Sequence, residues 1–269
     1  MAGASGRGPA THASSDNTTP RSIAKAMYDV KTESQCRLCG NTYGTRGAGQ
    51  HLQSCLKKLP CVPGSGEPPL LVSVHGDHPQ ANGAYVLFAI FPHDATLEQL
   101  DVYLRYHWLE CCGHLSRFES AGREYLGHEW PDPEPLSGEA PRSMRHPIAD
   151  AITPGSPALY EYDMGDTTSL TVRVQTAPPA AAAWQEEQGT AVAGATVMRN
   201  LMPERCRDCG GEAAFADGEG YVCAVGKRWG HERPLFNSPR DGADCFDEAA
   251  GPDLEALRMV LEVRREATT

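Results

Sequence analysis

The 269-residue chain is poor in aromatic residues, at 7%, and has no long hydrophobic run. No stretch reaches the roughly 20 consecutive apolar residues that a membrane-spanning helix needs. The first 30 residues lack the apolar block of a secretory signal. We therefore expect a cytoplasmic protein that makes no membrane contact.

The sequence also lacks the short motifs that define common enzyme classes: a glycine-rich phosphate loop, a nucleophile elbow and a zinc-protease helix. Three weak catalytic candidates remain. Asp163 and Asp166 flank Gly165 in the way that a carboxylate pair would, although Asp-x-Gly-Asp is also ordinary turn chemistry. His75-Gly-Asp-His78 supplies imidazoles, but we expect a solvated turn between two strands there.

Adjacent Cys111 and Cys112, followed by His114, leave two interpretations open. They are either a Cys/His nucleophile pair or thiols at a helix end, one of which packs in the core beside Trp108. The sequence favours the packing interpretation.

Charge is unevenly distributed. Residues 1–62 contain 8 Lys and Arg against 3 Asp and Glu, whereas residues 63–269 contain 16 against 32. An acidic body repels phosphate backbones, so any nucleic-acid contact would fall on the basic segment 21–60. A solvated surface with dispersed charge explains the same numbers.

Ten cysteines are present, and their spacing indicates metal binding more than disulfides. Cys36 and Cys39 form a Cys-x-x-Cys pair, and His51 and Cys55 follow one helical turn apart. Two thiolates on a knuckle, with an imidazole and a thiolate on a helix, provide the tetrahedral set of a structural Zn²⁺. The sequence therefore predicts a zinc finger in which the metal substitutes for a core.

Base reading by this finger is not favoured. Thr45 is expected to cap the finger helix, whose exposed start offers only Arg46 and Gln50 as long polar side chains between glycines. Lys57 and Lys58 remain as phosphate contacts. The pattern indicates a metal that holds the fold.

A second cluster predicts a degenerate zinc ribbon. Cys206, Cys209 and Cys223 are three of its ligands, and Gly226 stands where the fourth would complete a second Cys-x-x-Cys. Cys245 and His231 are the two candidates for the fourth ligand.

The expected architecture is α+β, because strand and helix patterns mix without a βαβ repeat. A capping box at Thr96 and Gln99 starts a helix, and Ala177–Trp184 is expected to be a loop. A Pro-Gly-rich linker, residues 60–69, separates the finger from the main domain. The expected units are a tail and lead-in at 1–33, the finger at 34–60, an α+β domain with a mixed sheet at 70–200, the ribbon at 201–247 and a helix at 252–267.

Several motifs resemble one family. Trp108-Leu-Glu-Cys-Cys-Gly-His-Leu-Ser-Arg-Phe118, Tyr160-Glu-Tyr-Asp-Met-Gly-Asp166-Thr-Thr and Asn237-Ser-Pro-Arg240 are similar to segments of the family named after open reading frame three of the Ri plasmid. The finger resembles that of a branch with an N-terminal Cys/His finger. Met164, Asp166 and Gly226 depart from the family pattern.

The resemblance implies an α+β domain associated with mobile elements, with no assigned biochemical role. The leading hypothesis is a non-enzymatic zinc-binding adaptor for a protein or a nucleic acid. The alternative is a metal-dependent hydrolase or nuclease that uses Asp163 and Asp166. A further alternative is that the central domain recognises a protein partner while the finger supports the fold.

Overall fold

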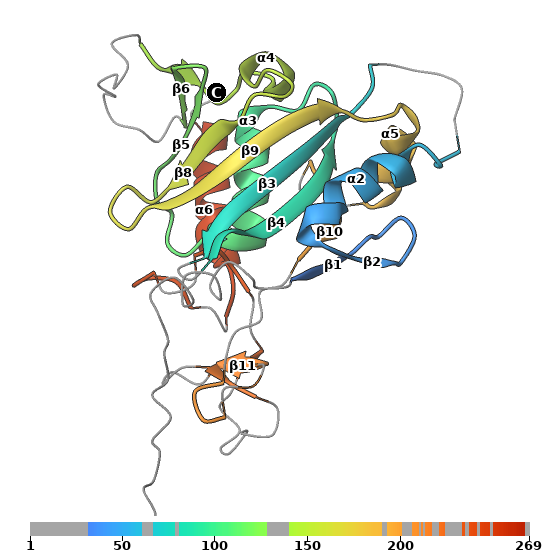
Figure 1. The fold of residues 1–269 in the computed structure, drawn as a ribbon. Coiled ribbons are helices and arrows are strands. Elements are labelled where there is room, and N and C mark those ends of the chain that lie inside the picture. Colours follow the sequence, from blue (N-terminus) through green and yellow to red (C-terminus); the bar gives the residue numbers. More distant parts are fainter. Residues whose placement is uncertain are drawn as a thin grey trace, which may run out of the picture.

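The computed structural model describes residues 32–60, 67–78, 81–127, 140–189, 193–200, 206–209, 211, 213–216, 221–223, 233–234, 237–240, 243–247 and 250–266. These residues form an α+β structure, as predicted (Figure 1). Residues 1–31 of the expected tail and lead-in (1–33) lie outside them, as do residues 61–66 of the expected linker. None of the helices in this described part combines the length and the apolar character that a membrane crossing requires.

The centre of the fold is an eight-stranded sheet in the order β10-β4-β3-β9-β8-β5-β6-β7. Neighbouring strands are antiparallel except for the parallel pair β6 and β7, so the sheet is mixed. Its strands are β3 (Leu70–His78), β4 (Ala81–Phe91), β5 (Ser116–Ser120), β6 (Arg123–Leu126), β7 (Arg142–Ser143), β8 (Ala158–Tyr162), β9 (Thr168–Thr176) and β10 (Ala195–Arg199).

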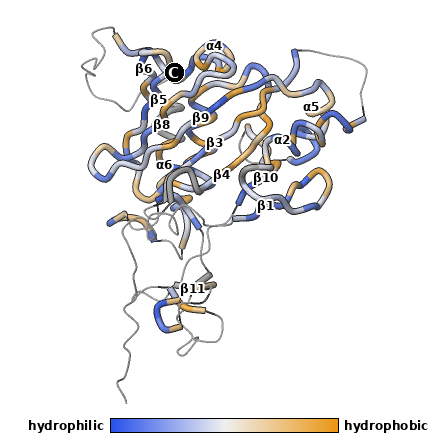
Figure 2. The backbone as a smooth tube through the Cα atoms, viewed as in Figure 1, coloured by the Kyte–Doolittle hydropathy of each residue, from blue (hydrophilic) through white to orange (hydrophobic). Residues whose placement is uncertain are grey.

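One face of the sheet packs against α3 (Leu97–Leu104), the π-helical turn η1 (Arg105–Leu109) and α4 (Ile148–Ala151). The predicted capping box starts α3: the Thr96 hydroxyl accepts from the Gln99 N–H, and the Gln99 side chain accepts from the Thr96 N–H. Alternate residues of each strand point to this face, because side chains alternate along a strand. In Figure 2 hydrophobic residues follow the central strands β3 and β4.

The opposite face is covered by the N-terminal finger, which consists of β1 (Glu33–Gln35), β2 (Thr42–Gly44) and α2 (Thr45–Leu56). The predicted ββα order is confirmed. The finger shares one hydrophobic cluster with the sheet: its Leu52 and Leu56, both fully buried, belong with Phe88 and Ile90 of β4. The finger therefore packs against the sheet of the main domain, although a linker was expected between the two.

Backbone contacts join the finger to the sheet edge as well. Arg37 donates its N–H to the Val197 carbonyl at 2.9 Å, and Ser34 bridges to Asn200. The Asn200 amide donates to Thr32, and its oxygen accepts from the Val86 N–H. The finger thus adds a layer to the central fold (Figure 1).

Three local expectations are corrected. Residues 180–187 form a helix, α5 (Ala180–Glu187), whose Ala181 is buried under the second face of the sheet. His75-Gly-Asp-His78 continues β3 and is not a turn. Thr45 is the first residue of α2, after an N-cap at Gly44 with no side-chain cap, and its hydroxyl bonds to that of Thr32.

The C-terminal part holds a small antiparallel sheet of β11 (Phe215–Ala216), β12 (Tyr221–Val222) and β13 (Arg233–Pro234), followed by α6 (Leu254–Glu266). The predicted C-terminal helix is present. It docks on the body: Asp253 donates its N–H to the Glu110 carbonyl at 2.7 Å, and Ala256 and Leu257 are buried.

Candidate metal centres

The four predicted finger ligands converge. The ligand atoms of Cys36, Cys39, His51 and Cys55 all lie within 4.8 Å of one another, with Cys39 Sγ 3.5 Å from His51 Nε2. A knuckle presents the first pair, because Gly40 (φ 74°) allows its N–H to reach the Cys36 carbonyl at 2.8 Å. The group can hold a metal ion with no ligand missing.

The surroundings of the finger ligands set their protonation. Burial raises the pKa of the Cys55 thiol to about 12 and lowers the pKa of His51. The N–H of Asn41 is the main cause that lowers the pKa of Cys39. The ring of Tyr43 stacks on His51 with centroids 3.6 Å apart, which fixes the imidazole plane. Metal binding here must displace the proton of Cys55.

The second predicted group has three members. The sulfur atoms of Cys206, Cys209 and Cys223 lie within 4.8 Å of one another, and the Cys209 and Cys223 sulfurs are 3.7 Å apart. Cys206 donates its N–H to Gly211 at 2.8 Å in a second knuckle, and backbone N–H groups of Cys209 and Cys223 lower the pKa of the Cys206 thiol to about 7.

One of the two candidates for the fourth ligand of this group is corrected. Cys245 lies elsewhere, within 3.3 Å of Cys111 Sγ, and is not grouped with Cys206. His231, the other candidate, lies outside the described residues.

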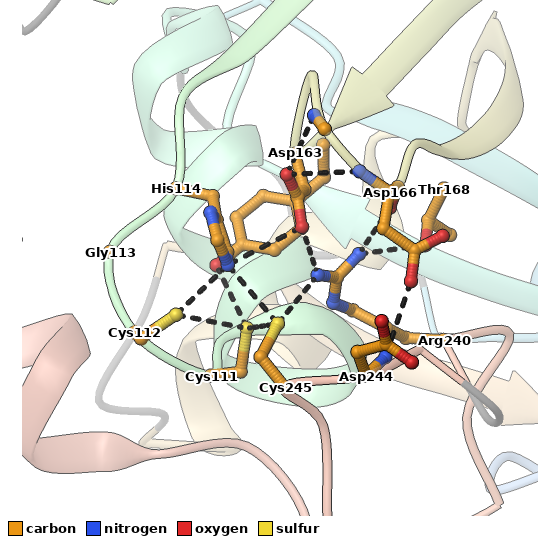
Figure 3. A network of polar contacts seen from close by, with 12 residues as sticks. Cys111, Cys112, Gly113, His114, Asp163, Asp166, Thr168, Arg240, Asp244 and Cys245 are labelled. Carbon is orange, nitrogen blue, oxygen red and sulfur yellow. Dashed lines mark hydrogen bonds and ion pairs between the residues drawn. The ribbon is translucent and has the colours of Figure 1, made fainter.

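A third group was not predicted. Cys111, Cys112, His114 and Cys245 also place their ligand atoms within 4.8 Å of one another (Figure 3). The first three follow η1, and the fourth comes from the C-terminal segment, more than a hundred residues later. Neither interpretation of the Cys111-Cys112 pair anticipated this, because only the fold brings Cys245 there. Cys111 also packs against the main core, as the packing interpretation required.

The weak catalytic candidates have local partners. Asp163 (φ 63°) accepts the N–H groups of Gly165 and Asp166 on Oδ1, and its Oδ2 pairs with Arg240 and with His114 at 3.3 Å. Arg240 and these backbone N–H groups lower the pKa of Asp163 against the opposing effect of burial. Asp166 accepts the N–H of Asp244 at 3.2 Å. The turn interpretation of this segment agrees with these contacts.

His75 joins no metal group among the described side chains, and the side chain of His78 lies outside them. The rings of His75 and Phe88 pack edge to face, with their centroids 6.4 Å apart. Burial lowers the pKa of His75. Its neighbour Gly76 has a packing role: a Cβ there would lie 2.8 Å from Pro239 Cβ.

Comparisons with known proteins add little. No family model matches the chain, and no curated protein matches it. One solved structure, a protein of unknown function from Methanosarcina mazei Go1, is similar over 40% of this chain and 58% of its own, with 22% identity and a TM-score of 0.31. The chain thus spans little more than half of that protein, and this likeness carries no argument about function.

Proposed function

We propose that this chain is a zinc-dependent, non-enzymatic binding protein in which the finger Zn²⁺ holds one layer of the fold in place. The observation that carries the proposal is the complete ligand set of Cys36, Cys39, His51 and Cys55 on a finger packed against the sheet. Catalytic zinc sites keep a coordination position for water or substrate, whereas four protein ligands close the site.

The rival activity, a metal-dependent hydrolase or nuclease, receives less support from the carboxylates. In such an activity Asp163 and Asp166 would bind the metal, so their carboxylate oxygens would have to be accessible to it. Both Asp163 oxygens accept hydrogen bonds or ion pairs, and Asp166 accepts from Asp244 and so helps to anchor the C-terminal segment. These contacts favour a role in structure for the pair.

A protein is the partner that the charges favour. Residues 63–269 carry 32 acidic against 16 basic side chains, which opposes a nucleic-acid backbone. The exposed Lys57 and Lys58, after the end of α2, could add a weak phosphate contact. The motifs quoted above support membership of the Ri-plasmid open-reading-frame-three-like family and its mobile-element association, and the free thiols support a reducing compartment such as the cytoplasm.

Two measurements on the full-length chain test this proposal. Elemental analysis of protein purified at neutral pH should find zinc, with about one ion per chain lost in Cys39→Ser and none in Cys61→Ser, which removes a cysteine that belongs to neither Cys-x-x-Cys pair. In a turnover assay on nucleic acid with added divalent metal, the wild-type protein should show no more cleavage than Asp163→Asn. Zinc-free protein, or cleavage that Asp163→Asn abolishes while its circular dichroism is unchanged, would overturn the proposal.

A further inference from the structure

The group of Cys111, Cys112, His114 and Cys245, here called the clasp, has the donor set and spacing of a closed zinc site. Its sulfur and nitrogen atoms approach as follows: Cys111 to Cys112 3.7 Å, Cys111 to Cys245 3.3 Å, Cys112 to His114 Nε2 2.9 Å, and His114 Nε2 to Cys245 3.2 Å. Tetrahedral zinc with ordinary bond lengths places such atoms roughly 3.5–3.8 Å apart. A small outward adjustment accommodates the ion.

The loop that presents three of these ligands is fixed from beneath by a buried carboxylate. Glu110 Oε1 accepts the N–H of Cys111 at 3.0 Å, the N–H of Gly113 at 2.6 Å and the hydroxyl of Tyr162 at 2.8 Å. Its other oxygen binds Arg105 at 2.8 Å, and Glu110 is fully buried. Gly113, with φ 82°, makes the turn between Cys112 and His114. The loop conformation is therefore built independently of any ligand.

The surroundings of Cys245 suit a thiolate bound to a metal. Arg240 Nη2 lies 3.2 Å from Cys245 Sγ and also pairs with Asp163, while Nη1 donates to the Asp166 carbonyl at 3.0 Å (Figure 3). Three thiolates and a neutral imidazole around Zn²⁺ carry a net charge of about −1, which a guanidinium offsets. A cation that donates to a ligating sulfur and is oriented by a carboxylate is the outer support that zinc sites use.

The clasp joins the C-terminal segment to the central fold beside several direct contacts. Near Cys245, Ser238 donates to the Trp108 carbonyl at 2.6 Å, and Pro239 packs on Gly76 of β3. Beyond it, Asp253 donates its N–H to the Glu110 carbonyl and α6 follows. An ion at the clasp would cross-link residues 237–266 to the end of η1.

We propose that the clasp binds one Zn²⁺ as a structural site and thereby fastens the C-terminal segment to the central sheet. Four protein ligands close the site to water and substrate, so the ion fastens and does not catalyse. This inference is independent of the finger: either site can bind zinc without the other.

Zinc content and thiol protection test the proposal on the full-length chain. Cys245→Ser should lose about one zinc per chain relative to wild type, and Cys61→Ser should lose none. In wild type kept reduced, iodoacetamide followed by peptide mapping should spare Cys112 and Cys245 until a chelator is added, although both side chains are exposed. The wild-type experiment needs no variant, so a misfolded Cys245→Ser would not remove the test.

Rapid alkylation of Cys112 and Cys245 in zinc-loaded protein would overturn the proposal, as would full zinc content in folded Cys245→Ser. Limited proteolysis gives the structural consequence: in wild type the segment 237–266 should be cut faster after chelation. If Cys39→Ser lost zinc and Cys245→Ser did not, the finger proposal would stand and the clasp proposal would be rejected.

Discussion

At the residue scale, the most unusual feature is a fully buried ion network. Arg105 donates from Nε to Asp101 at 2.9 Å, from Nη1 to Glu110 at 2.8 Å and from Nη2 to the His114 carbonyl at 2.7 Å. The network lies between α3 and the loop of the clasp. Buried charges are tolerated only when they are paired and hydrogen-bonded, and here every guanidinium nitrogen has a partner.

Replacement of Arg105 by methionine should therefore be costly. It leaves two buried carboxylates without their cation, and removing one partner of a buried ion pair typically costs about 3–5 kcal/mol. Urea unfolding measures the change. Arg173→Met, at an exposed position of β9, is the matched control and should change the free energy of unfolding by less than about 0.5 kcal/mol. A similar small effect for both variants would contradict this account of the network.

His107 should make the protein acid-sensitive. Burial, reinforced by the charges of Arg199 and Arg37, lowers its pKa from 6.5 to about 4. Between these values the unfolded chain binds a proton that the folded chain does not, so stability falls as the pH falls from about 6.5 to about 4.

For this histidine the loss between pH 7 and pH 5 should be about 2 kcal/mol. His107→Gln should remove that part of the acid loss and leave the remainder, as measured by urea unfolding at the two pH values with zinc present. An equal acid loss in both proteins would refute the assignment to His107.

At the element scale, local sequence signals predicted the parts that depend on near neighbours. The Thr96 and Gln99 capping box, the Cys-x-x-Cys knuckle and the two strands β3 and β4 each depend on residues close together in the sequence, and the structure has them. The α5 helix was missed because Ala-Pro-Pro-Ala reads as low complexity, while its helical form depends on burial of Ala181 under the sheet.

The clasp was missed for a different reason. Cys245 lies 134 residues from Cys111, and no spacing rule connects them. The sequence also did not predict that the finger docks on the sheet. Apolar residues at Leu52 and Leu56 are compatible with a small core inside the finger and with a core shared with the sheet. In both cases the tertiary structure brings together residues that are distant in the sequence, and a single sequence did not show which residues would meet.

Substitution of Gly76 tests how closely the C-terminal segment packs against β3. A Cβ at this position would approach Pro239 Cβ at 2.8 Å and Leu170 Cδ2 at 2.9 Å, and the proline ring cannot rotate away. Gly76→Ala should destabilise the chain by about 1–3 kcal/mol through overpacking. Proteolysis should also release residues 237–266 more readily. Gly47→Ala, on open space in α2, should be neutral or stabilising, and equal behaviour of the two variants would contradict the packing argument.

At the scale of the whole molecule, the finger is one layer of a three-layer arrangement, with the sheet between it and α3. Leu52 and Leu56 of the finger cover Phe88 and Ile90 of β4, the second strand from one edge of the sheet. An isolated finger of this size buries too little apolar surface to fold without its metal, so loss of zinc should loosen this layer and uncover the second face of the sheet. The central fold is therefore expected to depend on the finger metal.

The most direct test is the thermal unfolding midpoint of the central core in Cys39→Ser, followed by near-UV circular dichroism of buried aromatic residues such as Trp108. Cys61→Ser is the control. If the finger zinc supports the sheet, the midpoint in Cys39→Ser should fall by more than about 5 °C, because each kcal/mol is worth about 2–4 °C in a chain of this size. An unchanged midpoint in zinc-depleted Cys39→Ser would show that the finger metal is not what holds this fold.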